Sequence, residues 1–374
     1  MKLEDLRTPF FLIDEKKMED NLELLKRIQE DTGCKILLAQ KAFSAYKCYP
    51  FMKKYLAGTT ASGLYEAKLG KEEFGGETHV FAPAFREDEF EEILDVADDI
   101  VFNSSSQVKQ FGERAKKAGK SIGLRVNPEC STQEGHEIYD PCGAGSRLGT
   151  VLSEFDEDIL PILDGLHFHT LCEQNSDDLA TTAKAFEEKF GKYLHGMKWL
   201  NMGGGHHITR EDYDIETLKK VINHFQDNYK VQVYLEPGEA VVLNAGYLYT
   251  EVLDIVHNGI DIAILDTSAA CHMPDVIEMP YRPPLKNTGE ANEKKYTYRL
   301  AGPTCLAGDV IGDYSFDESL EKGTRLRFDD MALYTMVKTN TFNGMRLPDI
   351  NLLRKDGNVE MLNTFGYEDF KCRL

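Results

Sequence analysis

The sequence lacks any long apolar run. No segment approaches the roughly 20 apolar residues that a helix needs to cross a bilayer. The first ten residues, MKLEDLRTPF, have no apolar centre and carry acidic side chains early, so they do not resemble a secretory signal peptide. We therefore expect a cytoplasmic protein without a membrane partner.

Paired cysteine motifs are also absent, although the chain has eight cysteines. No two of them form a CxxC pair, so neither a zinc ribbon nor a thioredoxin-like redox motif is predicted. Scattered cysteines in a cytosolic protein of 374 residues are expected to be mostly buried free thiols.

Positive charge is scarce, because the formal net charge is −20. This balance excludes the basic face with which a protein binds a nucleic-acid backbone. It is compatible with a cationic substrate, although an acidic surface also serves simple solubility.

Strand-like and helix-like patterns alternate over residues 35–238. Amphipathic helical patterns, for example at 14–33 and 103–120, separate the strand-like segments and start with Asp or Asn. Such alternation predicts a parallel sheet with helical crossovers. Eight units favour closure into a (β/α)8 barrel, with an open doubly wound sheet as the alternative. The predicted strands are 35–40, 58–63, 78–84, 99–104, 121–127, 165–171, 198–204 and 231–238.

The sequence pattern changes after about residue 240, where the periodicity typical of amphipathic helices is weak. Strand-like segments at 247–256, 261–268, 295–303 and 324–330 are separated by turns and predict a second, β-rich domain. The segment 8–14 could join it. We expect a barrel domain over 12–242 and a β-rich domain formed by 1–11 with 243–374.

Polar and glycine residues gather where the predicted strands end. In a barrel these ends meet at one rim, which is where chemistry is found. The residues at this position are Lys41, Ser62, Arg125, Asn127, His167, His169, Gly203, Gly204, Gly205 and Glu236.

Each of these residues has an ordinary explanation beside a functional one. Lys41 is either a solvated strand end or an amine placed to form a Schiff base. The glycines 203–205 form either a simple turn or a phosphate-binding loop that leads to the helix predicted from residue 214; the P-loop pattern is absent. His167 and His169 could pack, ligate a metal or face a flat cofactor. Glu236 is either a satisfied buried carboxylate or the partner of a pyridinium nitrogen.

The functional explanations share one cofactor, pyridoxal 5'-phosphate (PLP), which needs a lysine, a phosphate loop, a group against its ring and an acid at its ring nitrogen. Eight motifs then carry a resemblance to the fold-type III PLP-dependent decarboxylases, which include ornithine and diaminopimelate decarboxylases. They are LLAQKAF (37–43), LRVNP (124–128), SRLG (146–149), GLHFHT (165–170), NMGGGHH (201–207), EPGEA (236–240), GPTCLAGD (302–309) and ALYT (332–335).

The resemblance implies a PLP-binding TIM-like barrel followed by a β-rich, alanine racemase-like domain. It also implies a homodimer with shared active sites and no metal. The resemblance implies that Lys41 forms the Schiff base with PLP, that His169 stacks on the cofactor ring and that Glu236 contacts the ring nitrogen. It implies that Arg125 contacts the cofactor and that Cys305, from the partner chain, donates a proton. The residues implied to bind the phosphate are Gly203, Gly204, Gly205 and Tyr334.

The chain departs from the family pattern at several positions. Glu239 stands where the family has an arginine that helps to hold phosphate. HTLCE (169–173) replaces the usual Gly-Ser after the histidine, and Glu66 lies one residue later than its family counterpart. Leu306 follows Cys305, where ornithine enzymes place an acid, and Asp309 comes later.

Within the family, LLAQKAF, EPGEA and DTSAACHMPDVIEMPYRP (266–283) are most similar to the carboxynorspermidine decarboxylases. The similarity implies decarboxylation of carboxynorspermidine or carboxyspermidine in polyamine biosynthesis, with substrate amines held by Glu239, Asp275, Glu278 and Asp309. A diaminopimelate, ornithine or arginine decarboxylase is an alternative. A metal-dependent barrel hydrolase built on His167 and His169, or a non-catalytic regulatory relative, is a rival of another class.

Overall fold

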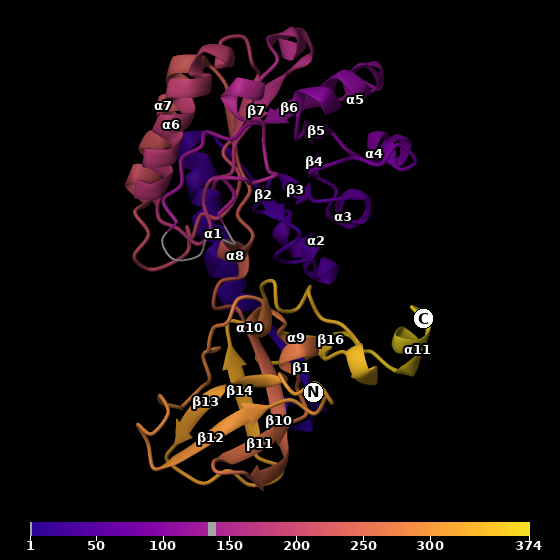
Figure 1. Cartoon of the computed structure of the whole chain (residues 1–374), viewed down its shortest axis with the longest axis vertical. Helices are drawn as coiled ribbons and strands as arrows, with labels where there is room; N and C mark the ends of the chain where they lie inside the picture. Colours follow the sequence, from indigo (N-terminus) through magenta and orange to yellow (C-terminus); the bar gives the residue numbers. More distant parts are fainter. Residues whose placement is uncertain (1, 134–139) are drawn as a thin grey trace. The chain divides into compact units, whose positions relative to one another are not determined.

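The chain consists of two compact units in a computed structural model that describes residues 2–133 and 140–374 (Figure 1). One unit combines Met1–Asp20 with Val242–Leu374, and the other spans Asn21–Val241. Among the described residues, no helix combines the length and the apolar character that crossing a membrane requires. All eight cysteines are free thiols, and four of them are buried.

The second unit is a closed barrel of eight parallel strands, β2 to β9. All eight predicted strands form, the barrel prediction is confirmed and the open-sheet alternative is wrong. All eight strands end before their predicted ends, because the polar and glycine residues there leave the sheet to build the rim. The strands are β2 (Lys35–Ala39), β3 (Gly58–Ala61), β4 (Glu77–Phe81), β5 (Asp99–Phe102), β6 (Ser121–Arg125), β7 (Gly165–His167), β8 (Trp199–Asn201) and β9 (Gln232–Leu235).

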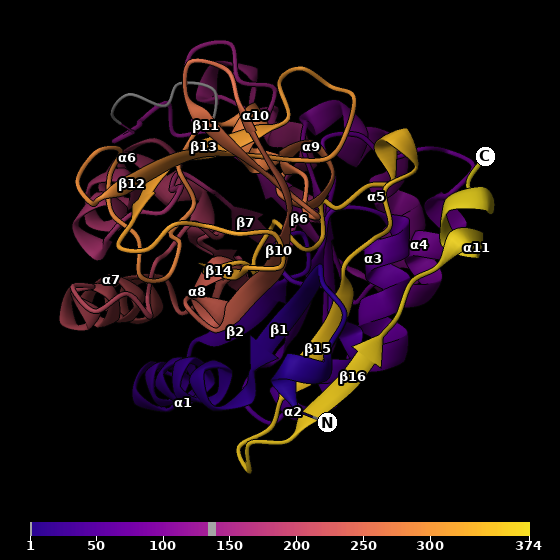
Figure 2. The same ribbon diagram turned by 90° about the horizontal axis from the view of Figure 1, so that it is seen from below.

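Helices cover the barrel, and some of them begin at side-chain caps. The Ser104 side chain accepts from Gln107 N–H at the start of α5, and Asp214 accepts from Thr217 N–H at the start of α7. Figure 2 shows α6 and α7 on one side of the strands and α3, α4 and α5 on the other. The helices are α1 (Glu15–Thr32), α2 (Tyr49–Met52), α3 (Leu64–Leu69), α4 (Phe90–Val96), α5 (Ser105–Lys117), α6 (Ser176–Leu194), α7 (Ile215–Tyr229) and α8 (Glu239–Val242).

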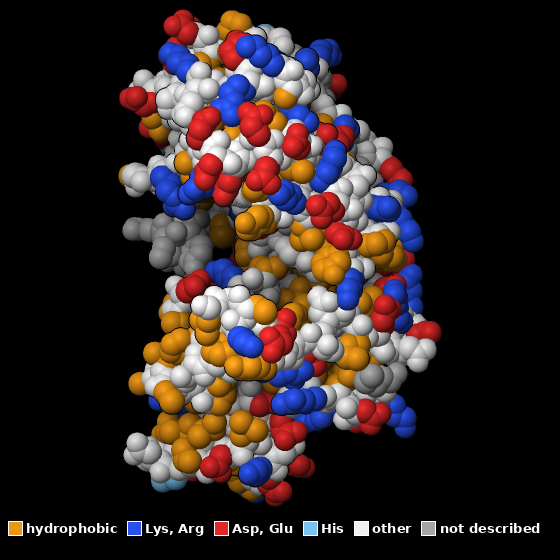
Figure 3. Space-filling view, turned by 90° about the vertical axis from the view of Figure 1, so that its right-hand side faces the viewer, with side chains coloured by type: hydrophobic (Ala, Val, Ile, Leu, Met, Phe, Trp, Pro, Cys, Tyr) orange, Lys and Arg blue, Asp and Glu red, His pale blue; other side chains and the backbone are white. Residues whose placement is uncertain are grey.

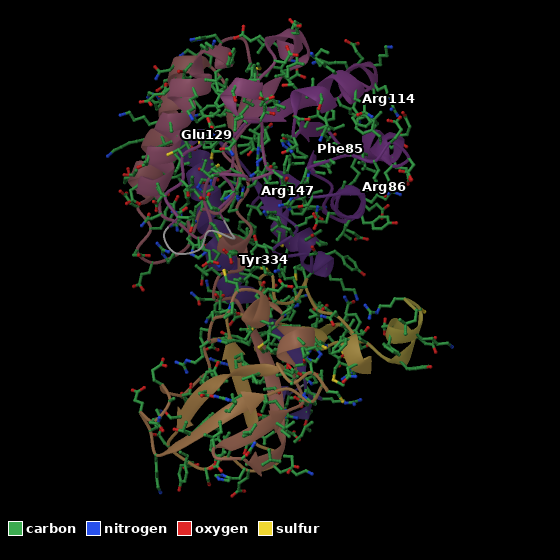
Figure 4. All side chains as sticks on the ribbon, in the orientation of Figure 1. Phe85, Arg86, Arg114, Glu129, Arg147 and Tyr334 are labelled. Atoms are coloured by element: carbon green, nitrogen blue, oxygen red, sulfur yellow. The ribbon has the colours of Figure 1, made fainter. Side chains whose placement is uncertain are left out.

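Outside the strands, aromatic rings fill the space under α4 and α5. Phe85, Arg86 and Arg114 lie on this side of the barrel (Figure 4). The Phe85 ring packs edge-on against Phe102 at 5.4 Å, and the Arg114 guanidinium lies 5.2 Å from the Phe90 ring centre. This side of the barrel is therefore packed by hydrophobic and cation–π contacts.

One tryptophan fills the middle of the barrel. Its indole occupies the space that two glycines leave open: a Cβ on Gly123 or Gly165 would lie 2.2 or 2.1 Å from Trp199 ring carbons. The Trp199 Nε1–H donates to Ser121 Oγ at 2.8 Å, which satisfies its polar atom. The interior below the rim is thus a packed core.

A charged cluster closes the end of the barrel opposite the rim. His79 Nε2 lies 3.3 Å from Glu77 Oε2 and 3.2 Å from Asp99 Oδ2, and Lys35 also pairs with Glu77. Burial acts to lower the pKa of His79, but the two carboxylates outweigh it and raise the pKa above its ordinary value. The β4–β5 register, which pairs His79 with Asp99, brings these charges together.

The first unit is built on an eight-stranded sheet in which β1 pairs with β10 antiparallel and with β15 parallel. Phe10 stacks on Tyr249 at 4.9 Å in its core. The β-rich second architecture is confirmed, and β1 belongs to it. The strands are β1 (Phe10–Asp14), β10 (Gly246–His257), β11 (Asp261–Leu265), β12 (Tyr296–Ala301), β13 (Val310–Phe316), β14 (Arg325–Asp329), β15 (Asp349–Leu353) and β16 (Val359–Asn363); the short helices are α9 (Ala269–His272), α10 (Asp275–Glu278) and α11 (Tyr367–Lys371).

Candidate active site

A hollow opens at the carboxyl ends of the barrel strands. Side chains from six strand ends face it, which is the position at which barrels place their chemistry. Its lining residues are Ala39, Lys41, Thr60, Ala61, Ser62, Phe81, Arg125, His167, His169 and Glu236. The sequence predicted that Lys41, Arg125, His169 and Glu236 would meet at one rim, and the structure brings them together.

Lys41 lies in a turn fixed by its neighbour Gln40. The buried Gln40 amide donates from Nε2 to the Glu66 carbonyl at 2.8 Å and accepts from Tyr49 OH at 3.1 Å. Solvent reaches the Lys41 side chain through the hollow, while the hollow's walls surround it. This crowding, followed by the charge of Arg125, lowers the pKa of Lys41.

Glu236 is a buried carboxylate with a donor at each oxygen. Asn201 Nδ2 donates to its Oε1 at 2.8 Å, and His167 Nε2 lies 3.2 Å from its Oε2. Burial acts to raise the pKa of Glu236, but these partners outweigh it and hold the pKa below its ordinary value. Burial lowers the pKa of His167, so His167 is the neutral partner and donates its Nε2–H.

His169 is seated on the glycine loop. The Gly204 N–H donates to His169 Nδ1 at 2.9 Å, so the ring proton lies on Nε2. A Cβ on Gly203 would lie 2.7 Å from the Cβ of His169, and one on Gly204 would lie 2.4 Å from the Glu236 carbonyl oxygen. Only glycine therefore fits beside the histidine and the end of β9.

The glycine loop already uses part of its backbone donors within the protein. The Gly203 N–H donates to Asn201 Oδ1 at 2.8 Å, so together with Gly204 two of the three N–H groups already bond within the protein. The loop leads to α7, which begins at Ile215 and is capped by the Asp214 side chain. The helix that the sequence predicted after the loop, from residue 214, is therefore present.

Arg125 is buried between a ring and a carbonyl group. Its guanidinium lies 4.7 Å from the Phe81 ring centre, and its Nη2 donates to the His169 carbonyl at 3.4 Å. Burial lowers the pKa of Arg125 to about 10, so the side chain stays cationic at neutral pH.

Among the described residues, neither His167 nor His169 belongs to a group of three or more side chains with the spacing of metal ligands. The Nε2 of His167 faces Glu236, and the Nδ1 of His169 accepts from a backbone N–H. Within residues 2–133 and 140–374, the two groups of side chains with metal-ligand spacing are Glu77, His79, Asp99 and Glu173, His207, Glu239.

Two departures from the family pattern meet in space. His207 Nε2 lies 3.0 Å from Glu239 Oε2, and an oxygen of Glu173, from HTLCE, comes within 4.8 Å of both groups. Burial, followed by Glu173 and Glu239, raises the pKa of Cys172 to about 11, while Lys41 lowers it. Cys172 is therefore a neutral thiol near neutral pH.

Cys305 and Asp309 share one loop of the sheet unit. Cys305 is exposed, and its N–H donates to Asn343 Oδ1 at 2.8 Å. Asp309 is 3% exposed, and its Oδ2 accepts from Ser268 Oγ at 2.9 Å and from Thr304 Oγ1 at 2.6 Å. These bonds fix the loop, and the substrate contact predicted for Asp309 stays a prediction.

Asp275 and Glu278 hold a lysine of their own unit. Both carboxylates bind Lys338 Nζ, and the Glu278 contact is 2.9 Å. Burial acts to lower the pKa of Lys338, but the two acids outweigh it and raise the pKa above its ordinary value. Tyr334, labelled in Figure 4, lies in the same loop region with a left-handed φ of 39°.

Sequence reasoning missed several supports of the site. Asn201, Phe81 and Gln40 were not singled out, and the role of His167 was left open. One signal was available: Asn201 directly ends a strand before the glycine loop, where a buried amide has to find partners. No pattern indicated the contact between His207 and Glu239, because it depends on how two loops fold.

Comparison with known proteins gives concordant matches. Residues 10–332 match the family described as "Pyridoxal-dependent decarboxylase, C-terminal sheet domain". The carboxynorspermidine/carboxyspermidine decarboxylase of Campylobacter jejuni is 44% identical over the full length of both chains. The carboxyaminopropylagmatine decarboxylase of Synechocystis is 40% identical, covering 100% of this chain and 97% of the relative.

A solved structure agrees with these matches. Carboxynorspermidine decarboxylase from Campylobacter jejuni, complexed with norspermidine, superposes with a TM-score of 0.92 at 44% identity, covering 99% of this chain and 100% of that one. The diaminopimelate decarboxylase of Aquifex aeolicus is more distant, at 25% identity over 72% of this chain and 69% of its own. The chain therefore belongs to the pyridoxal-dependent decarboxylase family.

Proposed function

We propose that the chain decarboxylates carboxynorspermidine or carboxyspermidine, with PLP as cofactor, and so produces norspermidine or spermidine. One observation carries the proposal. Lys41, His169 and Glu236 come from three different strand ends and line one hollow, in a chain that is 44% identical to a decarboxylase of these substrates.

The residues of the hollow fit PLP. Lys41 would hold its aldehyde carbon covalently, Glu236 would face its ring nitrogen, and His169 would lie against its ring. The fit rests on the geometry: the amine lines the hollow, the carboxylate is ionised, and the glycines let the loop pack closely against His169 and the end of β9. When bound, PLP supplies an electron sink for the electron pair left by the departing carboxylate.

The chain's own groups prepare this chemistry. The lowered pKa of Lys41 increases the share of the neutral, nucleophilic amine. The ionised and buried Glu236 would stabilise a positive charge on the ring nitrogen of the bound cofactor. Burial, followed by the charges of Lys41 and Arg125, keeps the pKa of His169 well below its ordinary value, so its ring is neutral.

We also propose a homodimer in which Cys305 donates the proton that replaces the carboxylate, while Tyr334 contacts the phosphate. Cys305 is exposed, and apolar side chains gather over the sheet unit in the lower half of Figure 3. Exposed apolar side chains of this unit include Leu253, Val256, Ile277, Leu306 and Phe342. A surface of this kind supports a partner chain over it.

The substrate's amines need carboxylates. Asp275 and Glu278 already hold the ammonium group of Lys338, which supports their use for an alkylammonium group. The net charge of −20 would also attract a polycation. The cytoplasmic location inferred from the sequence stays a prediction.

A second substrate has a specific observation in its favour. The 40% identical Synechocystis relative is a carboxyaminopropylagmatine decarboxylase, whereas the diaminopimelate decarboxylase of Aquifex aeolicus is 25% identical. Measuring CO2 release from carboxynorspermidine, carboxyspermidine, carboxyaminopropylagmatine, diaminopimelate, ornithine and arginine separates these cases. We expect the first two to have the highest kcat/KM; release from none of the six would contradict a catalytic function.

The attachment site has its own test. Borohydride reduction of the holoenzyme, followed by peptide mapping, should place the pyridoxyl label on Lys41. A label on any other lysine would overturn the assignment even if the enzyme were active.

A further inference from the structure

We propose that His207, oriented by Glu239, is a phosphate-binding residue of the cofactor site. The inference rests on the PLP part of the proposed function and goes beyond it by naming the side chain that meets the phosphate. Glu239 stands where the family has a phosphate-holding arginine, and His207 ends the NMGGGHH motif without a role assigned from the sequence.

The position of His207 suits an anion held at the glycine loop. It follows Gly203–Gly205 after a single residue, and Gly203 and Gly205 have left-handed φ angles of 70° and 80°. Backbone N–H groups in such a turn form a concave anion-binding surface. An anion bound there would lie beside the side chains that come next in the chain.

The loop's backbone alone offers few donors. The Gly203 N–H is used by Asn201 Oδ1, and the Gly204 N–H by His169 Nδ1. A phosphate with two negative charges is bound best by charge-assisted donors. Two of the three glycine donors are already in use, so a side chain has to contribute.

His207 has the free atom that this contact requires. The residue is 8% exposed, and its Nδ1 is buried without a hydrogen-bond partner among the described residues. Buried polar atoms nearly always have a partner, so an unpaired ring nitrogen beside an anion-binding loop indicates a missing ligand.

Glu239 completes the pair from the other side. Its Oε2 lies 3.0 Å from His207 Nε2, which fixes the ring plane and directs Nδ1 away from the carboxylate. An imidazole has two ring nitrogens, so the one that does not face the carboxylate is available to contact the phosphate. Glu173 lies nearby but is exposed, so water screens its charge.

The test compares two ligands that differ only in the phosphate. Apoenzyme is titrated with PLP and with pyridoxal, and the dissociation constants are read from absorbance and intrinsic fluorescence. We expect His207→Gln to weaken PLP about tenfold or more, the size of a charge-assisted hydrogen bond, and to change pyridoxal less than about twofold. Glu239→Gln should act in the same direction with a smaller effect.

A rescue and a matched control sharpen the result. In His207→Gln/Glu239→Arg a new cation stands beside the loop, and PLP affinity should recover while pyridoxal affinity stays unchanged. His224→Gln is the control, because His224 forms an exposed pair with Glu187 at 2.9 Å in the same unit. It should leave both affinities unchanged.

Three outcomes would overturn the inference. Equal weakening of PLP and pyridoxal would give His207 a merely structural role, and unchanged PLP affinity would remove it from the phosphate site. Loss of PLP affinity on dialysis against EDTA would instead indicate a divalent cation held by Glu173, His207 and Glu239. Should His207→Gln not fold, Glu239→Gln decides by the same two titrations. Failure of the wild-type chain to bind PLP at all would be a separate failure, that of the proposed function.

Discussion

His167 Nε2 lies 3.2 Å from Glu236 Oε2, and both side chains are buried inside the barrel. The pair explains how a carboxylate can stay ionised out of contact with water. The neutral imidazole donates a hydrogen bond, and Asn201 supplies a second donor at the other oxygen. A charge held in this way keeps a fixed orientation toward the hollow.

Replacing His167 by leucine should therefore impair the site more than replacing it by glutamine. Leucine removes the donor and leaves Glu236 with one partner, which costs about 1–3 kcal/mol of unfolding free energy and raises the carboxyl pKa. Glutamine can still donate. We expect kcat to fall by about tenfold or more in His167→Leu, with its pH profile displaced toward higher pH.

Unfolding curves and pH profiles of kcat check this prediction. Equal losses in the leucine and glutamine variants would contradict the hydrogen-bond explanation. An unchanged pH profile in His167→Leu would show that His167 does not set the ionisation of Glu236.

Gly204→Ala should disrupt the packing of the glycine loop against His169 and the hydrogen bond from the Gly204 N–H to His169 Nδ1. The added Cβ would lie 2.4 Å from the Glu236 carbonyl oxygen, a clash with backbone that only a shift of the loop can relieve. We expect a destabilisation of about 1–3 kcal/mol and a loss of activity. Gly63→Ala is the control, because no atom lies within 4 Å of the added Cβ and its φ is −178°. If both variants unfold at the same denaturant concentration as the wild type, the loop is not tightly packed.

The charged base of the barrel predicts a pH dependence of stability. The folded pKa of His79 is raised, so its contribution is fully present below the unfolded pKa of about 6.5 and is lost as the pH rises through the folded pKa. Burial acts to raise the pKa of Glu77, but His79 and then Lys35 outweigh it and lower it to about 2. The Glu77 contribution is therefore present above its unfolded pKa and lost as the pH falls toward 2.

Urea unfolding of the wild type and His79→Gln measures this effect. The stability difference between them should be largest near pH 5.5 and smaller at pH 9. A difference that grows toward alkaline pH would show that His79 is neutral in the folded protein.

The sequence predicted the barrel because its strands alternate with amphipathic helices, and it placed Lys41, His169 and Glu236 at one rim because strand ends meet there. It could not predict contacts that exist only after closure. Trp199 fills the interior only because Gly123 and Gly165 face it across neighbouring strands. The contact between His207 and Glu239 depends on two loops, and neither hydrophobic period nor capping residues determine a loop's path.

The sequence also could not predict which carboxylates already form ion pairs with side chains of the same chain. Asp275 and Glu278 look available in the sequence, but Lys338 lies between them in the structure. If these acids bind a substrate amine, Lys338 competes with it. Lys338→Met should then lower KM for a carboxypolyamine by about two- to fivefold, the range for a partly exposed ion pair, and leave kcat unchanged. Lys322→Met, an exposed lysine of the same unit, is the control. A raised KM would show that Lys338 supports the loop instead.

A variant of Asp309 tests whether this residue supports its loop or binds the substrate. Its buried carboxylate accepts bonds from Ser268 and Thr304, so it holds the loop on which Cys305 lies. Asp309→Ala leaves these donors unpaired and should cost about 1–3 kcal/mol of stability. The freed loop should also alter the rate at which Cys305 reacts with a thiol reagent, and kcat should fall with little change in KM. Asp317→Ala, which removes an exposed partner of Lys294, is the control and should change neither the thiol reactivity of Cys305 nor kcat. If Asp309 binds substrate directly, the result reverses: KM rises, while the thiol reactivity of Cys305 stays at its wild-type value.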